Sequence, residues 1–232
     1  MRVTVSHGDR SLAGAVRPGE SWSAAAGRIA ATVPGEPAAV DLSGETKRFE
    51  IDPDLRVGLR AMTRGDLPGV ARWRAQAHVH AWFAEEGSPD VRSVTEMYGA
   101  RIDGMTPIRM WVAEVNGRSV GFVQDYPIRD VPGFALLVPD PDAIGVDYAI
   151  GEPEWVGRGL GARIMWAWML RTRHRFPEAR TYFAAPDHRN EGSLRMLDKA
   201  GFERGTWFDE PTSNGTTATV VGCTLDVRRV LG

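Results

Sequence analysis

Residues 156–162 read V-G-R-G-L-G-A, and an apolar run typical of a helix, residues 164–170, follows almost directly. Glycines at alternate positions, Gly157, Gly159 and Gly161, leave backbone amides uncovered where that helix begins. Amides at a helix N-terminus point at a bound anion, and the helix dipole favours negative charge there. The loop therefore predicts either a phosphate-binding site or a tight turn between a strand and a helix.

The segments around the loop narrow this choice. A strand-like run at 143–151 precedes it, and we expect the helix after it to end near Phe176. A short strand at 181–185 and the sequence P-D-H-R-N-E-G-S-L-R-M-L-D-K-A-G-F at 186–202 come next. A dinucleotide-binding loop needs the spacing G-x-G-x-x-G, and a nucleoside-triphosphate loop needs Gly-Lys-Ser/Thr. The glycines of this chain match neither pattern.

Two motifs carry a resemblance to a known family. They are G-R-G-L-G after a strand, and N-x-x-S-x-R-x-x-x-K-A-G-F further along the chain. In this order and spacing they resemble the GNAT superfamily of acyl-CoA-dependent N-acetyltransferases, over roughly residues 56–228. Two groups are most similar: the aminoglycoside 6′-N-acetyltransferases, and the siderophore-lysine N-acyltransferases, whose P-D-x-R-N segment resembles residues 186–190. The resemblance implies an α/β fold with a mixed, mostly antiparallel central sheet flanked by helices.

Composition fits an ordinary globular protein. The chain has 232 residues, of which 43% are apolar and 25% charged. No apolar run approaches the roughly 18 residues of a membrane span, and the net charge of −2 argues against a broad nucleic-acid surface. The first residues lack the apolar core of a signal peptide, and Cys223 is the only cysteine. We therefore expect a cytoplasmic protein that binds neither nucleic acid nor membranes.

The pattern changes near Pro53. Residues 1–55 are expected to form a small β-rich N-terminal extension, and residues 56–232 the acetyltransferase domain. The extension either packs on the domain or on another subunit, or forms a lid over the acceptor site. Within the domain, Asn116-Gly117 between two alternating runs predicts a tight hairpin. Both a monomer and a homodimer agree with this sequence.

The resemblance implies acetyl-CoA as acyl donor. The loop would hold its pyrophosphate, and a backbone amide in the stretch 148–150 would polarise the thioester carbonyl. Arg158 and Arg163 would add positive charge near the pyrophosphate; the alternative is that they are solvated residues of the helix face. Asn190, which is also a natural helix N-cap, and Ser193 would contact the pantetheine arm. The expected cofactor-binding residues are Ala149, Ile150, Val156, Gly157, Arg158, Gly159, Leu160, Gly161, Ala162, Asn190 and Ser193.

Asp147 is the candidate catalytic residue. It lies on the strand that leads into the glycine loop, among apolar neighbours, where a carboxylate is costly unless it faces a cleft. It could bind the ammonium group of an acceptor and then take its proton, directly or through water. The similar aminoglycoside enzymes carry Asp at this point and the siderophore group carries His. A structural aspartate at the strand end is the alternative.

Substrate contacts are expected from two segments. In residues 78–86, Trp82 and Phe83 could form a wall, and Glu85 and Glu86 could hold ammonium groups; the alternative is a helix end with a solvated acidic tip. Gln124 and Asp125 follow the predicted hairpin, in a stretch to residue 154 that is rich in acidic residues. That stretch suits a polycationic acceptor, although solvated loop charges would have the same sequence.

Two positions depart from the resembling families. Leu197 stands where many of these enzymes have a tyrosine that can protonate the leaving thiolate, and Ala185 stands where both groups tend to carry an acceptor-side Asp. Cys223 lies in a late strand, so a cysteine relay is not expected. The five histidines form no metal-ligand cluster with acidic residues or cysteine, so we expect no metal.

The sequence therefore predicts transfer of an acetyl group from acetyl-CoA to a primary amine by direct attack. The preferred acceptor is a small polar, aminoglycoside-like molecule. The alternatives are a lysine-derived siderophore precursor as acceptor, or a domain that binds coenzyme A as a sensor without catalysis.

Overall fold

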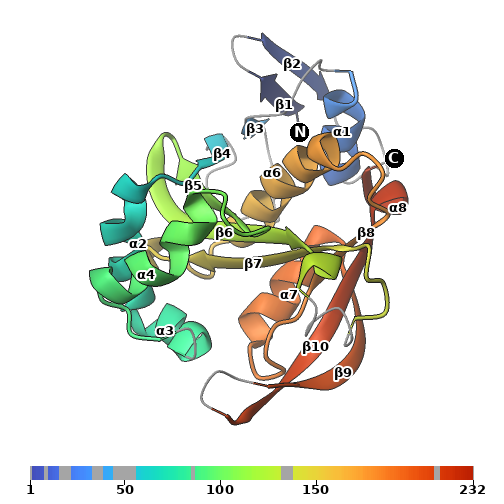
Figure 1. The fold of residues 1–232 in the computed structure, drawn as a ribbon. Coiled ribbons are helices and arrows are strands. Elements are labelled where there is room, and N and C mark those ends of the chain that lie inside the picture. Colours follow the sequence, from blue (N-terminus) through green and yellow to red (C-terminus); the bar gives the residue numbers. More distant parts are fainter. Residues whose placement is uncertain are drawn as a thin grey trace.

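The computed structural model describes residues 2–7, 10–15, 22–32, 39–43, 56–84, 87–131, 138–211 and 215–231. Its strands are β1 (Arg2–His7), β2 (Arg10–Ala15), β3 (Ala39–Ser43), β4 (Arg56–Ala61), β5 (Arg109–Val115), β6 (Arg118–Pro127), β7 (Ile144–Ile150), β8 (Thr181–Ala184), β9 (Glu203–Pro211) and β10 (Thr217–Asp226). They form one sheet in the order β2-β1-β3-β4-β5-β6-β7-β8-β10-β9 (Figure 1). Only β7 and β8 pair in parallel within this described sheet, which confirms the expected mixed, mostly antiparallel α/β class.

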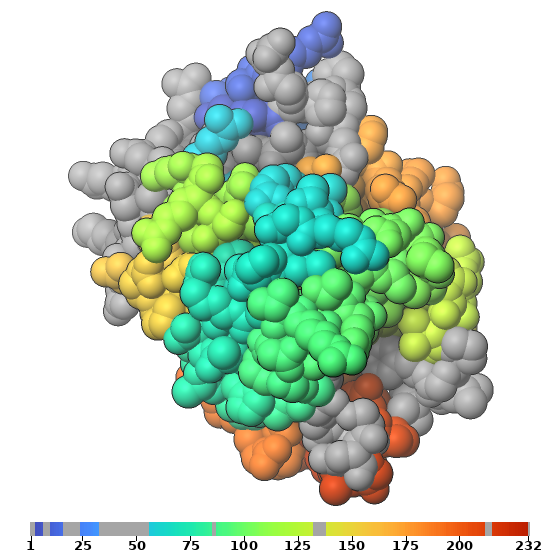
Figure 2. Space-filling view, turned by 60° about the vertical axis from the view of Figure 1, so that its left-hand side comes forward, coloured from blue at the N-terminus to red at the C-terminus, as the bar shows by residue number. Residues whose placement is uncertain are grey.

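Helices cover both faces of the sheet (Figure 1). They are α1 (Trp22–Ala30), α2 (Leu67–Arg74), α3 (Ala77–Phe83), α4 (Val91–Ile102), α6 (Leu160–Arg175), α7 (Glu191–Ala200) and α8 (Val227–Leu231). Side chains alternate along a strand, so Val112 of β5 packs with α2 and α4, and its neighbour Trp111 packs with α6. Figure 2 shows α2 to α4, in cyan to green, spread over one face.

The central hairpin sets the register of the sheet. Asn116 and Gly117 adopt φ angles of 50° and 77°, as the tight turn predicted from the Asn-Gly pair requires. This turn places Arg109 opposite Asp125, and Gln124 of β6 then lies opposite Asp147 of β7. The hairpin thus fixes which residues meet on the strand that leads to the glycine loop.

The N-terminal strands continue the same sheet. Ala39 of β3 pairs with Gly58 of β4, and β1 pairs with both β2 and β3. The proposed domain boundary at residue 55 lies outside the described residues. The division at residue 55 therefore stays a prediction.

A buried carboxylate ties the two central strands to α6. Asp125 is 1% exposed, and its oxygens accept hydrogen bonds from Arg109, from Trp111 Nε1 at 2.7 Å and from Trp168 Nε1 at 3.0 Å. The Arg109 guanidinium also lies 4.5 Å from the ring centroid of Phe176, just after α6. A charge this deep is tolerated because donors from β5 and α6 surround it.

Replacing Asp125 with alanine should destabilise the fold strongly. The change leaves one guanidinium and two indole N–H groups without their acceptor, which we expect to lower the free energy of unfolding by about 3–5 kcal/mol. Denaturant titration measures this loss. Asp142→Ala is the matched control, because its ion pair with Arg129 is exposed and should contribute less than about 1 kcal/mol. Equal losses in the two variants would contradict the structural role of Asp125.

Candidate active site at the open edge of β7

Strands β7 and β8 separate soon after they meet. Only Ile144 and Gly145 of β7 pair with β8, opposite Tyr182 and Phe183. In contrast, β7 pairs with β6 along its whole length, from Ile144 to Ile150. The second half of β7 therefore has a free backbone edge on the side that β8 has left.

Two amides of β7 point into that gap. The amide of Gly151 donates to the carbonyl of Val120, so the opposed residues Gly121 and Ile150 form a pair without mutual hydrogen bonds. By the alternation of an antiparallel ladder, Ala149 bonds to β6, and the amides of Tyr148 and Ile150 face away from β6. His78 Nε2 lies 2.9 Å from the Ile150 carbonyl oxygen, as expected for a group on this open edge. Ala149 is thus a poor candidate for polarising a substrate carbonyl.

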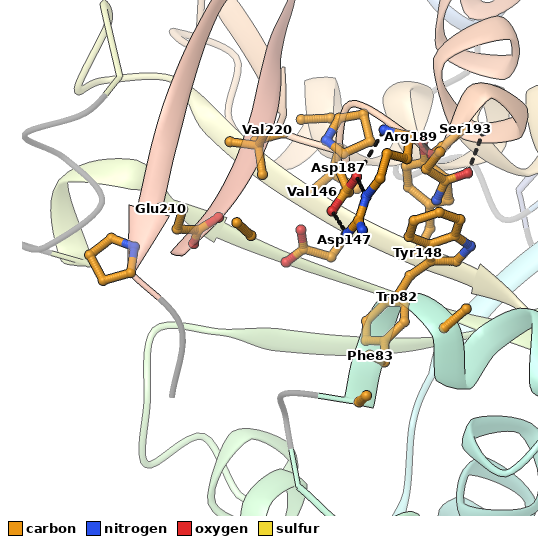
Figure 3. A pocket seen from close by; sticks show the side chains of 18 of the residues that line it. Trp82, Phe83, Val146, Asp147, Tyr148, Asp187, Arg189, Ser193, Glu210 and Val220 are labelled. Carbon is orange, nitrogen blue, oxygen red and sulfur yellow. Dashed lines mark hydrogen bonds and ion pairs between the residues drawn. The ribbon is translucent and has the colours of Figure 1, made fainter. Parts of the chain in front are cut away.

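A cavity of about 900 Å³ opens between the separated strands. It lies between α3 and α4 on one side and α7 with the β9–β10 hairpin on the other (Figure 3). Its polar and aromatic lining includes Trp82, Phe83, Arg101, Tyr126, Asp147, Tyr148, Asp187, Arg189, Asn190, Ser193 and Glu210. No described residue of the N-terminal extension lines this cavity, so the strands β1 to β3 are not a lid over it.

Asp147 faces the cavity and is held by side chains of β6. Gln124 Nε2 donates to Asp147 Oδ2 at 2.8 Å, and the Tyr126 hydroxyl forms a further hydrogen bond with Asp147. Arg101 Nη1 donates to Gln124 Oε1 at 2.5 Å. Because arginine only donates, this contact fixes the amide of Gln124 with its NH₂ group toward Asp147. In Figure 3 Asp147 lies between Glu210 on one side and Trp82 and Phe83 on the other.

Three carboxylates, Asp147, Asp187 and Glu210, line the cavity together with two arginines, Arg101 and Arg189. Burial raises the pKa of Tyr126 well above its usual value, and the charges of Asp147 and Glu210 raise it further. Asp187 also lines the cavity, but Arg189 holds it with two hydrogen bonds of 2.9 and 2.7 Å. The chemistry of this lining suits an acceptor that carries ammonium groups.

Other acidic residues of the stretch 124–154 form ion pairs and hydrogen bonds within the fold. Glu152 accepts hydrogen bonds from Arg72 and from Trp73 Nε1, at 2.8 and 2.9 Å, and so joins α2 to the turn after β7. Glu154 pairs with Arg118 at 3.0 Å. Much of the acidic composition noted in the sequence is therefore committed to ion pairs.

The glycine loop has the geometry of an anion cradle. Gly157 and Gly159 adopt positive φ angles of 77° and 84°, and α6 begins at the next residue, Leu160. Among the turns and loops that the structure describes, the amides of Gly157 and Gly159 find no backbone acceptor. A Cβ on Gly157 would meet only open space, whereas one on Gly161 would lie 2.9 Å from the Met196 side chain. Gly157 and Gly159 thus fit a phosphate ligand, and Gly161 lets α6 pack on α7.

The start of α7 brings two further expected residues to the cavity. Asn190 caps the helix, accepting a hydrogen bond from the Ser193 amide at 3.1 Å, as its N-cap alternative predicts. The Ser193 hydroxyl meets the Tyr148 hydroxyl at 2.5 Å. Asn190, Ser193 and Tyr148 all line the cavity, so α7 and β7 form two walls of one site.

The structure gives the expected substrate residues four different outcomes. Trp82 and Phe83 line the cavity, and Glu85 and Glu86 lie outside the described residues. Gln124 is 4% exposed, is not among the residues that line the cavity, and contacts Asp147 from β6.

Asp125, its neighbour, points to the opposite face of the sheet, because successive side chains of a strand alternate. We therefore withdraw Asp125 from the substrate site. Arg163 is only 3% exposed, so the positive charge expected from it at the glycine loop is not at the surface. Arg158 is exposed, with Nη1 3.3 Å from the carbonyl oxygen of Glu154.

Sequence reasoning missed Tyr126, Arg101 and Glu210. Tyr126 follows Gln124 by two residues, and the period of a strand places both side chains on one face. That signal was available in the sequence. Arg101 at the end of α4 and Glu210 on β9 reach the site only through tertiary packing, and no local pattern marks them.

The described residues also bear on three other possibilities, a reactive cysteine, a metal site and a membrane-spanning helix. Cys223 is fully buried in β10, and burial raises the pKa of its thiol to about 11, which disfavours the thiolate. No group of three or more His, Cys, Asp or Glu in the described part of the chain could hold a metal ion. None of the described helices has the length and apolar character needed to cross a membrane.

Comparison with known proteins identifies sequence relatives of this chain. The family profile "Acetyltransferase (GNAT) domain" matches residues 63–210. Aminoglycoside N(6')-acetyltransferase type 1 of Klebsiella pneumoniae is 29% identical over 150 residues, which cover 64% of this chain and 74% of that protein. Lysine N-acyltransferase MbtK of Mycolicibacterium paratuberculosis is 25% identical over 152 residues, covering 65% of this chain and 66% of that protein.

Solved structures show the same similarity. The structure of AAC(6')-Ib in complex with ribostamycin and coenzyme A has a TM-score of 0.64 and 26% identity, covering 73% of this chain and 93% of that chain. The structure of AAC(6')-Ib with paromomycin and acetyl-CoA has a TM-score of 0.63 at the same identity and coverage. Since the family profile matches more than half of its length, the chain belongs to the GNAT family of acetyltransferases.

Proposed function

We propose that this protein transfers the acetyl group of acetyl-CoA to a primary amine of a small, polycationic, aminoglycoside-like acceptor. The observation that carries the proposal is the position of Asp147. Its carboxylate faces the cavity on the strand whose amides at Tyr148 and Ile150 point into the same gap. An amine, an acyl carbonyl and a proton acceptor can therefore meet at one short stretch of β7.

The residues of the chain fit acetyl-CoA as acyl donor. Gly157 and Gly159 would hold its pyrophosphate at the N-terminus of α6, where the helix dipole adds to the amide donors. Asn190 and Ser193 would lie along the pantetheine arm. Similar solved structures hold coenzyme A or acetyl-CoA, which supports this choice of donor.

The reaction would proceed by direct attack of the amine on the thioester. Asp147 would bind the acceptor's ammonium group and take a proton as the C–N bond forms, directly or through water. The amides of Tyr148 and Ile150 would donate to the carbonyl oxygen as it gains charge. A preorganised donor of this type lowers the barrier by about 3 kcal/mol.

Gly157→Ala should weaken binding of coenzyme A by about tenfold, because a side chain would cover the amides and strain the positive φ. Isothermal titration calorimetry with coenzyme A measures this change. Gly104→Ala is the matched control, since Gly104 has a φ of 72° and equally open surroundings but lies in the turn after α4 and not at the N-terminus of α6. Both variants carry the same backbone strain of about 1–2 kcal/mol, and only Gly157→Ala should lose affinity. If Gly157→Ala and Gly104→Ala bound coenzyme A with equal affinity, the glycine loop would not be part of the acetyl-CoA site.

Asp147→Asn should lower kcat by about 100-fold or more, because the neutral amide can neither hold the ammonium nor take a proton. The affinity for coenzyme A should change by less than about threefold, since the glycine loop is untouched. Release of the coenzyme A thiol measures turnover, with Asp142→Asn as a surface control. Unchanged turnover in Asp147→Asn would exclude this carboxylate from the mechanism.

A panel of amines tests the acceptor class. We expect aminoglycosides to be acetylated faster than monoamines at low salt, with an advantage that shrinks as added salt screens the cavity charges. Glu210→Gln should raise KM for polycationic acceptors by about fivefold or more, with little change in kcat, because it removes charge without touching the reacting amine. A monoamine preference that Glu210→Gln does not change would contradict a polycationic acceptor.

One observation favours a second acceptor class. All residues of the segment P-D-H-R-N at 186–190 except His188 line the cavity, and a lysine N-acyltransferase is among the relatives. N-hydroxylysine and lysine derivatives therefore belong in the same panel, with longer acyl donors beside acetyl-CoA. Binding of coenzyme A without turnover of any amine would favour the third alternative, a non-catalytic sensor.

A further inference from the structure

The leaving thiolate of this reaction needs a proton that position 197 cannot supply. Leu197 is an aliphatic side chain, fully buried between α7 and the core. One turn earlier on the same helix, Ser193 faces the cavity and contacts a tyrosine from another element. That tyrosine, Tyr148, belongs to β7.

The Tyr148 side chain reaches from β7 to the start of α7. Its ring packs against the core cluster around α6, and its hydroxyl meets the Ser193 hydroxyl at 2.5 Å (Figure 3). Tyr148 follows Asp147 directly, so the two side chains leave opposite faces of β7 while both line the cavity. A proton acceptor and a proton donor thus lie on the two faces of β7, next to the backbone amides that point into the gap.

We propose that Tyr148 is the general acid that protonates the leaving thiolate, in place of the tyrosine absent at position 197. This inference rests on the proposed acetyl transfer. Ser193 hydrogen-bonds the Tyr148 hydroxyl, positions it and connects it to solvent at the start of α7.

The step balances as follows. The nitrogen lone pair forms the C–N bond, the C–S bond breaks with its electron pair on sulfur, and the Tyr148 hydroxyl proton passes to that sulfur. Asp147 or water removes the extra proton from nitrogen, and the Tyr148 oxygen regains a proton from solvent through Ser193. The products are the amide and the free thiol, with no oxidant or reductant required.

Two other tyrosines and a histidine near Tyr148 have hydrogen-bond partners of their own. The Tyr126 hydroxyl bonds to Asp147 on the acceptor face, and His78 Nε2 contacts the Ile150 carbonyl. Tyr182 lies fully buried on β8, with its hydroxyl directed to the carbonyl of Met169. Burial raises the pKa of Tyr148 above its usual value, which keeps its hydroxyl protonated at neutral pH.

Turnover of Tyr148→Phe gives the first test. The variant keeps the ring and loses only the hydroxyl, and we expect kcat to fall by about 10- to 100-fold while KM for acetyl-CoA stays within about threefold. Tyr182→Phe is the matched control, since it removes a hydroxyl from the core and should leave kcat unchanged. The solvent isotope effect on kcat should also differ between the parent and Tyr148→Phe, because one proton transfer is lost.

A titration without turnover gives the second test. The ultraviolet absorbance of the thiolate reports the pKa of the thiol of bound coenzyme A. A donor hydroxyl stabilises the thiolate, so this thiol should titrate about one pH unit higher in Tyr148→Phe than in the parent or in Tyr182→Phe.

The outcomes separate the two proposals. A Tyr148→Phe variant with kcat within twofold of the parent and an unshifted thiol would overturn the acid role, while the proposed acetyl transfer would stand. If Tyr148→Phe raised KM for acetyl-CoA at constant kcat, Tyr148 would contribute only to binding of the acyl donor, and the acid role would be overturned. A parent that binds coenzyme A but acetylates no amine would overturn the transfer itself, and the acid role with it.

Discussion

The early separation of β7 from β8 is the constraint on which the site depends. Two paired residues at the start of β7 hold the sheet together, and the remaining backbone edge of the strand has no partner strand. Free amides on a strand edge are normally a liability that proteins cover. Here the gap holds a cavity lined by α3, α7 and the last hairpin, so the edge becomes a set of donors at the place where a substrate can enter. The same separation makes room for the Tyr148 side chain to reach α7.

Because side chains alternate along a strand, the carboxylates of Asp125 and Asp147 lie on opposite faces of the sheet and have different roles. Asp125 of β6 faces α6, where Arg109 and two tryptophans surround it and hold the scaffold rigid. Asp147 lies on the other face of the sheet, where Gln124 and Tyr126 orient it without closing it off from the cavity. Arg101 fixes the orientation of Gln124, so the geometry of the candidate base depends on a residue of α4.

Much of the framework followed from local patterns. The Asn-Gly turn, the strand expected at 143–151 and the cap at Asn190 each depend on residues close together in sequence, and the structure has all of them. The substrate residues were harder to predict. Asp125 was assigned to the substrate because it adjoins Gln124, and a shift of one residue along a strand reverses the face. Glu210 and Arg101 gave no local signal, since their neighbours in sequence differ from their neighbours in space.

The sequence by itself determined the glycine loop, the order of strands and helices around it and hence the family, because these features depend on backbone freedom and on short-range periodicity. The tertiary structure alone decided which charges enter the cavity, which are buried or paired, and which hydroxyl lies at the start of α7. Those outcomes depend on contacts between elements far apart in the chain, such as Tyr148 with Ser193 and Arg101 with Gln124. The strength of these contacts depends on the distance between the partners and on their burial, and both are set only when the sheet and its helices have packed.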